Sequence, residues 1–239
     1  MSARILFVGS LVFLLVILTG SAGLASAQVS QKLAKTIMGK NFLGAEEVSK
    51  HLGVRLTDKE LMRALSVPFS EATLRQCKDT HILFLGVDHD EKDTPLTIRR
   101  LRMMFPATGQ PRFRSYPKRS EPHNSYADDE TPQLRWYLIA RSLREESRSK
   151  PYWQQEQFLK ENEYRERAVV YVYMMLLVYR ARGEWLFERD LVCTKDVGSD
   201  GAPVAAGYFD DEGLYVSDWW VERDQHFGLA PACEPDSPY

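Results

Sequence analysis

The sequence contains only three cysteines, Cys77, Cys193 and Cys233, in 239 residues. So few cysteines exclude a small scaffold held together mainly by disulfides, and their wide spacing lacks the paired C-x₂-C pattern of common zinc sites. An apolar core must therefore supply most of the stability. Because the number is odd, at least one thiol has no intramolecular partner, and a disulfide between two of the three is possible without the sequence showing which.

Motifs of the common enzyme classes are absent as well. The chain has no G-x-S-x-G, no phosphate-binding glycine loop and no H-E-x-x-H. Ser147-Arg148-Ser149-Lys150 fits S-x-x-K, but the S-D-N and K-T-G elements that such an enzyme needs are missing. We therefore assign no catalytic residue and no cofactor, and we lean towards a protein without enzymatic activity.

The one long apolar run lies at the N-terminus. Arg4 precedes an apolar stretch over residues 5–18, and small residues follow up to Ala25-Ser26-Ala27. This order is typical of a cleavable secretory signal peptide over residues 1–27, and the stretch is shorter than the ~20 residues of a membrane span. We predict an exported protein, periplasmic or extracellular, with no transmembrane span after cleavage. The alternative is an uncleaved N-terminal helix that anchors the chain.

Composition indicates a folded chain of moderate charge. Hydrophobic residues make up 44% and charged residues 27%, which excludes a wholly disordered protein. The net charge is -2 for the whole chain and -3 once Arg4 is removed with residues 1–27. A balance of this kind predicts no binding of nucleic acid.

The order of apolar runs and turn residues predicts an α+β fold. We expect short N-terminal helices, then a mainly antiparallel sheet, a meander, with a helix packed on it. The mature chain divides into a mostly helical region with one strand (28–106), a proline-rich loop or linker (107–132) and an antiparallel sheet region (133–239). Strands are expected at 81–87, 134–139, 185–194, 203–209 and 214–220.

Three helix starts carry recognisable signals. Thr57 and Glu60 fit a capping box, Ser70 is a good N-cap residue, and Thr94-Pro95 is typical of a helix start. A polar helix is expected over 152–164.

Residues 168–179 are apolar at nearly every position, so periodicity cannot separate a buried helix from a buried strand. Their valine and tyrosine content and the turn at Arg182-Gly183 favour a central strand.

Three stretches carry a resemblance to a known family: PFSEATLRQCKDTHIL (68–83), QLRWYLI (133–139) and RARGEWLFERDLVCTKDVGSDG (180–201). They look like parts of a family of uncharacterised exported bacterial proteins. Most of these residues are typical of cores and turns, so they indicate relatives rather than chemistry. The resemblance implies no activity and no functional residue.

One acidic loop is a candidate metal site. Asp88, His89 and Asp90 follow an expected strand, and carboxylates with an imidazole can hold a divalent cation. The simpler interpretation is a solvated turn before the next helix. A Cys–His pairing is also conceivable between Cys77 and His81, or through His51, His123 or His226. However, a thiol between a helix and an apolar strand is typical of a buried side chain. A small exported hydrolase or metal-dependent enzyme with its site near 81–93 is therefore our second functional hypothesis.

Basic and acidic residues are concentrated in different parts of the sequence, and this separation supports our leading functional hypothesis. Seven basic residues and no acidic one lie between Arg99 and Arg119, whereas the C-terminal stretch from Asp196 is strongly acidic. We predict an exported, non-enzymatic binding or assembly protein of the cell envelope, with an anionic envelope component or a protein as its partner. The simpler interpretation of the charge pattern is that the basic segment packs against the acidic half of the same protein. A purely structural accessory of an envelope complex is the third functional hypothesis. The binding residues that we expect are Arg112, Arg114, Lys118 and Arg119.

Overall fold

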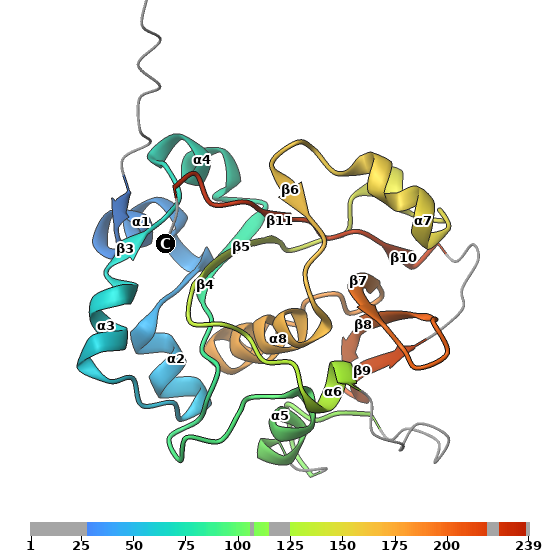
Figure 1. Cartoon of the computed structure of the whole chain (residues 1–239), viewed down its shortest axis with the longest axis horizontal. Coiled ribbons are helices and arrows are strands. Elements are labelled where there is room, and N and C mark those ends of the chain that lie inside the picture. Colours follow the sequence, from blue (N-terminus) through green and yellow to red (C-terminus); the bar gives the residue numbers. More distant parts are fainter. Residues whose placement is uncertain (1–27, 106–107, 115–124, 219–224, 238–239) are drawn as a thin grey trace, which may run out of the picture.

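The computed structural model describes residues 28–105, 108–114, 125–218 and 225–237 (Figure 1). The predicted signal peptide, residues 1–27, lies outside these ranges. Lys118 and Arg119, two of the predicted binding residues, also lie outside them.

The N-terminal half alternates short helices with short strands. Its elements are β1 (Val29–Ser30), α1 (Gln31–Met38), η1 (Gly39–Asn41), β2 (Phe42–Leu43), α2 (Ala45–Leu52), α3 (Asp58–Ala64), β3 (Ser66–Val67), α4 (Glu71–Cys77), β4 (His81–Leu85), α5 (Ile98–Met104) and α6 (Ser125–Asp128).

The C-terminal half holds the longest helix and the longest strands. Its elements are β5 (Trp136–Ala140), η3 (Glu145–Ser147), α7 (Tyr152–Gln155), η4 (Glu156–Phe158), β6 (Glu163–Tyr164), α8 (Ala168–Arg182), β7 (Leu191–Val197), β8 (Pro203–Asp210), β9 (Gly213–Asp218), β10 (Phe227–Gly228) and β11 (Ala232–Cys233).

The strands form three sheets that confirm the α+β prediction. A five-stranded sheet has the order β2-β4-β5-β11-β6, a four-stranded sheet the order β10-β7-β8-β9, and β1 pairs with β3. All pairs are antiparallel except β2 with β4 and β10 with β7. The five-stranded sheet joins strands from both halves of the chain, and the meander that we predicted is the run β7-β8-β9 in the other sheet.

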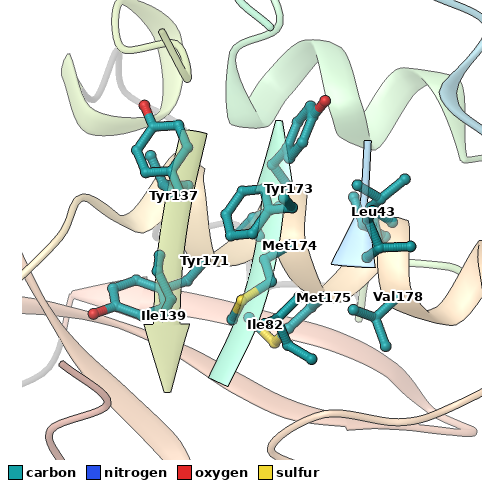
Figure 2. Close-up of a cluster of buried hydrophobic side chains, with 14 of the residues drawn as sticks. Leu43, Ile82, Tyr137, Ile139, Tyr171, Tyr173, Met174, Met175 and Val178 are labelled. Atoms are coloured by element: carbon teal, nitrogen blue, oxygen red, sulfur yellow. The ribbon is translucent and has the colours of Figure 1, made fainter. Parts of the chain in front are cut away.

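The prediction of a strand at residues 168–179 is wrong, because this segment is the central helix α8. All residues of α8 from Ala168 to Val178 are buried, so no polar face exists to reveal a helical period. Figure 2 shows α8 side chains against Ile82 and Ile139 of the five-stranded sheet. Gly183 ends the helix in the left-handed conformation, φ 67°, and its N–H bonds to the carbonyl of Tyr179.

The tyrosines of α8 satisfy their hydroxyl groups inside the core. Tyr171 donates to the carbonyl of Ala230 at 2.7 Å, and Tyr173 donates to the carbonyl of Leu85 at 3.1 Å. A buried hydroxyl without a partner would cost about 1–3 kcal/mol. These bonds let tyrosine, which favours strands in general, occupy a buried helix here.

Two of the three predicted helix starts are confirmed. Thr57 Oγ1 accepts from the Glu60 amide at 3.4 Å and the Glu60 carboxylate accepts from the Thr57 amide at 2.7 Å, while Ser70 Oγ accepts from the Thr73 amide at 3.1 Å. The start at Thr94-Pro95 is wrong. Pro95 forms a β-bridge with His89, and helix α5 begins three residues later.

The polar segment 152–164 does not form one helix. It divides into α7, the short turn η4 and the strand β6, and the Glu163 carboxylate accepts from the Lys160 amide at 2.9 Å between η4 and β6. Among the described residues, no helix combines the length and the hydropathy needed to span a bilayer.

Candidate metal centre

The three cysteines are all buried and all carry free thiols. Cys193 lies in β7, where its sulfur accepts a hydrogen bond from Gln155 Nε2 at 3.4 Å. Cys77 ends α4 and Cys233 lies in β11, and these two approach each other without reaching disulfide distance. The structure therefore does not support a disulfide.

The fold brings Cys77, His81 and Cys233 together from three elements. A tight turn after α4 leads directly into β4, so His81 begins the strand four residues after Cys77. Strand β11 lies two places from β4 in the sheet, separated from it only by β5. One ligand atom from each of the three residues lies within 4.8 Å of the other two.

His81 presents a nitrogen that makes no hydrogen bond. Its Nδ1 lies 2.8 Å from Thr80 Oγ1, which in turn lies 3.4 Å from the carbonyl of Cys77. Thr80 can donate to that carbonyl and accept from Nδ1–H, which leaves a lone pair on Nε2. The Nε2 atom is buried and has no hydrogen-bond partner among the described residues. A buried polar atom in this state is a candidate for a ligand contact.

The pKa values of the two thiols are shifted in opposite directions. A hydrogen bond from the Cys233 thiol lowers the pKa of Cys77 and outweighs the opposing effect of burial, and the nearby His81 lowers it further. The same hydrogen bond raises the pKa of Cys233, and burial raises it again. Cys77 is thus the first thiol to ionise, because Cys233 stabilises its thiolate. A thiolate is the form that binds metals.

An ordered ion pair lies beside the thiols. Glu163 is the register partner of Cys233 in the sheet, and its carboxylate lies 2.7 Å from Arg144 Nη1. Arg144 holds the pKa of Glu163 below its usual range although burial opposes this. Because Arg144 neutralises Glu163, the carboxylate adds little negative charge to the cluster, and the metal ligands that remain are two sulfurs and one imidazole.

Sequence reasoning found part of this cluster. It named Cys77 with His81 as one conceivable combination among several histidines. It could not find Cys233, which is distant in the sequence and reaches the cluster only through the pairing of β11 with β5.

The predicted metal residues Asp88 and His89 do come together, and they meet a third residue. His89 Nδ1 lies 2.6 Å from Asp88 Oδ1, and His89 Nε2 lies 3.6 Å from Glu60 Oε1. The hydrogen bond to Asp88 raises the pKa of His89, with burial opposing. Both nitrogens therefore face carboxylates, and a metal ion would have to displace a proton that these carboxylates stabilise. Glu60 was recognised in the sequence only as a capping residue.

Asp90 has a different role from its neighbours. Its carboxylate accepts from the amides of Lys92 at 2.9 Å and Thr94 at 3.0 Å, and it pairs with Arg100. Although burial opposes ionisation, these bonds lower the pKa of Asp90 to about 2. The residue closes the loop between β4 and α5, and both of its carboxylate oxygens accept hydrogen bonds from within the protein. Asp90 thus does not join Asp88 and His89.

An open groove of about 510 Å³ lies beside this loop, between Arg55, Asp58 and His89. The hydrolase hypothesis required a concave surface here, and the groove provides one. Its side chains are mostly charged and exposed, and only His89 belongs both to the groove and to the Glu60–Asp88–His89 cluster.

Two predicted binding residues are engaged inside the protein. Arg112 donates to the carbonyl of Asp211 at 2.8 Å, and Arg114 pairs with Asp210 and, at 3.2 Å, with Glu212. Arg112 and Arg114 are therefore bound to the acidic turn between β8 and β9, whereas Arg99 pairs with Asp128 and Arg100 with Asp90. The prediction of a binding surface now depends on Lys118 and Arg119.

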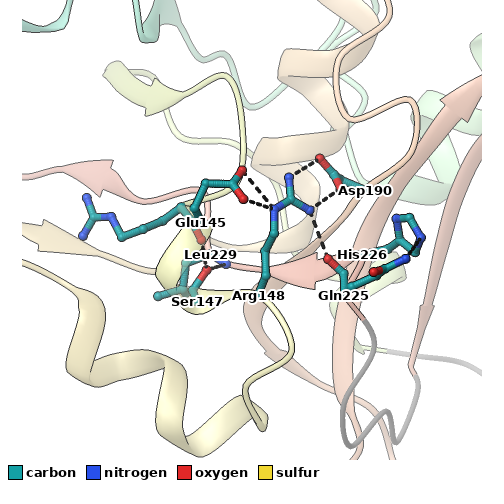
Figure 3. Close-up of polar contacts among 8 residues, drawn as sticks. Glu145, Ser147, Arg148, Asp190, Gln225, His226 and Leu229 are labelled. Atoms are coloured by element: carbon teal, nitrogen blue, oxygen red, sulfur yellow. Dashed lines mark hydrogen bonds and ion pairs between the residues drawn. The ribbon is translucent and has the colours of Figure 1, made fainter.

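The S-x-x-K sequence is a structural element. The Ser147 hydroxyl is buried, donates to the carbonyl of Arg144 at 2.6 Å and accepts from the Leu229 amide at 2.9 Å. Arg148 holds Asp190 through two bonds of 2.6 and 3.0 Å (Figure 3). Both residues tie η3 to β10 and the start of β7, and the serine hydroxyl proton is already engaged by the Arg144 carbonyl.

Comparison with known proteins gives no relative. No family model matches the chain, and no curated protein or solved structure matches it significantly. The functional argument therefore comes from the described residues alone.

Proposed function

We propose that this chain is an exported protein that binds a thiophilic metal ion, Zn²⁺ in the first instance, through Cys77, His81 and Cys233. Two observations together carry the proposal: one nitrogen of His81 lies within 4.8 Å of both sulfurs, and the buried His81 Nε2 has no hydrogen-bond partner among the described residues. The proposal that the protein is exported rests on the sequence pattern of residues 1–27 alone.

The ligand types favour a soft or borderline cation. Two thiolates and one imidazole suit Zn²⁺ and Cu⁺, whereas Mg²⁺ and Ca²⁺ prefer oxygen ligands. In a tetrahedral zinc site, Zn–S bonds of ~2.3 Å place two sulfurs about 3.8 Å apart. The ligand atoms lie within 4.8 Å of one another, so the two sulfurs need to approach by no more than about 1 Å when a metal binds. Three protein ligands leave a fourth position for water or for another molecule.

The supporting contacts around His81 have the arrangement found at metal sites. A ligating histidine usually passes its other N–H to a neighbouring acceptor, which fixes the tautomer and the ring orientation. Thr80 Oγ1 provides this acceptor at 2.8 Å. By contrast, His89 in the second cluster has carboxylates at both nitrogens, so we place the metal at the thiol cluster.

The test is metal loading of the purified chain and of matched variants. We expect one Co²⁺ or Zn²⁺ per chain by elemental analysis, and a sulfur-to-cobalt charge-transfer band with Co²⁺. Cys77→Ser, Cys233→Ser and His81→Gln should each lose the band. Cys193→Ala removes a buried thiol outside the cluster, and His89→Gln alters the second cluster, so both should keep it.

Two results would refute the proposal. One is wild-type protein that binds no metal while its thiols react as free cysteines. The other is metal binding, measured by elemental analysis, that survives in Cys77→Ser and Cys233→Ser but is lost in His89→Gln, which would move the site to Glu60–Asp88–His89.

A further inference from the structure

A second, smaller pocket opens where the β1–β3 pair and the end of α3 meet the sheet. Its volume is about 240 Å³, and its wall is largely apolar, with Leu85, Leu134 and Trp136 contributing. The indole of Trp136 is fixed by a hydrogen bond from Nε1 to the carbonyl of Ala64 at 3.1 Å. None of the thiol-cluster residues lines this pocket, so it is independent of the proposed metal site.

Two arginines give the pocket a positive charge. Arg63 lies in the last turn of α3, is exposed, and forms no ion pair with any described residue. Arg135 is neutralised by Glu166, 2.7 Å away, and stacks 4.5 Å over the ring of Tyr137. Because Glu166 compensates Arg135, the excess charge of the pocket comes from Arg63.

One donor at the pocket is both buried and unused. Arg135 Nε has no hydrogen-bond partner among the described residues, although Nη2 of the same guanidinium donates to Glu166 at 2.7 Å and to Tyr164 at 3.4 Å. Such a buried donor is destabilising unless something accepts from it. An acceptor brought by a ligand would satisfy it, and a negatively charged acceptor would be attracted by Arg63.

We propose that this pocket binds a small organic carboxylate, with its charged group between Arg63 and Arg135 Nε and its apolar body against Trp136 and Leu134. One water occupies ~30 Å³, so the volume equals that of about eight waters or of a ligand with about ten non-hydrogen atoms. An apolar wall with a few convergent polar groups is typical of small-molecule sites. Inorganic anions would leave that wall unused.

The test compares three probes on the chain as purified from cells. Benzoate carries the charge and a flat ring, benzyl alcohol keeps the ring without the charge, and acetate keeps the charge without the ring. By saturation-transfer NMR titration, we expect benzoate to bind at least tenfold more tightly than either of the others. Arg63→Ser should weaken benzoate at least fivefold, whereas Arg189→Ser, which removes an exposed arginine remote from the pocket, should change it less than twofold.

A direct readout locates the carboxylate. In ¹⁵N-edited spectra the Arg135 Nε–H signal should shift as benzoate is added, because Nε gains an acceptor. The proposal is overturned if benzyl alcohol binds as well as benzoate, if Arg63→Ser binds benzoate like the wild type, or if the Arg135 signal does not move. These results are independent of metal loading, so they leave the proposed metal site unaffected.

Discussion

Thr80 fixes the imidazole of His81 from one side, with Oγ1 2.8 Å from Nδ1, while the opposite nitrogen makes no hydrogen bond with any described residue. This relationship fixes the tautomer of the ring and leaves the lone pair of Nε2 available, without involving the metal itself. Partners of this kind are worth ~10–100-fold in metal affinity. A substitution of Thr80 therefore tests the site while all three metal ligands stay in place.

We expect Thr80→Ala to weaken zinc binding by about 10–100-fold, because the ring loses its anchor. Thr80→Ser keeps the hydroxyl and should bind like the wild type. The measurement is competition against a chromophoric zinc chelator at constant pH. Unchanged affinity in Thr80→Ala would mean that the ring orientation does not depend on Thr80.

The unequal thiols predict how many protons metal binding releases. Because the hydrogen bond from Cys233 lowers the pKa of Cys77, that sulfur is already a thiolate at pH 8. The raised pKa of Cys233 keeps its proton in place until a metal displaces it. We expect about one proton released per Zn²⁺ at pH 8, whereas two ordinary thiols would release more.

Calorimetry in buffers of different ionisation enthalpy measures this number. In Cys233→Ala the lowered pKa of Cys77 should return towards its usual range, because the donor of the hydrogen bond is removed. Release of two protons by the wild-type chain would contradict the assignment of Cys77 as the thiolate.

The sequence predicted local structure better than the contacts between distant segments. The capping box at Thr57 and the N-cap at Ser70 are confirmed because their hydrogen bonds span three residues. Helix α8 was missed because burial on all sides removes the polar face that reveals a helical period. For the candidate site, the pair Cys77 and His81 was within reach, but Cys233 arrives through strand pairing that no local pattern encodes.

Asp90 predicts a specific loss of stability in acid. Its pKa is about 2 in the folded chain against an ordinary value of 3.8. A lowered folded-state pKa gives stability that is complete above about pH 4 and is lost as the pH falls towards 2. The shift corresponds to about 2 kcal/mol of stability at neutral pH.

We therefore expect Asp90→Asn to lower the free energy of unfolding by about 2 kcal/mol at pH 7. The difference from the wild type should shrink between pH 4 and pH 2. Asp93→Asn is the matched control, because Asp93 is an exposed carboxylate in the same loop with φ 59°, which asparagine tolerates. Urea unfolding at several pH values measures both, and equal losses in the two variants would refute the role of Asp90.

Within the basic segment, arginines that pair inside the fold can be tested separately from residues predicted to bind a partner. Arg114 binds Asp210 and Glu212 and donates through Nε to the carbonyl of Gly213 at 3.0 Å. Arg114→Ser should therefore lower the free energy of unfolding by about 1 kcal/mol, the upper range for partly exposed ion pairs, and high salt should reduce the loss.

Lys118 and Arg119 test the envelope-binding prediction separately. If these two residues contact an anionic partner, the double variant Lys118→Ser, Arg119→Ser should weaken binding to vesicles containing phosphatidylglycerol at low salt while its urea midpoint stays at the wild-type value. Arg114→Ser should show the reverse, with a lower midpoint and little change in vesicle binding. Vesicle binding that is the same in all three proteins would mean that the basic segment stabilises the β8–β9 turn and recruits no anionic membrane, because charge used within the fold is not available to a partner.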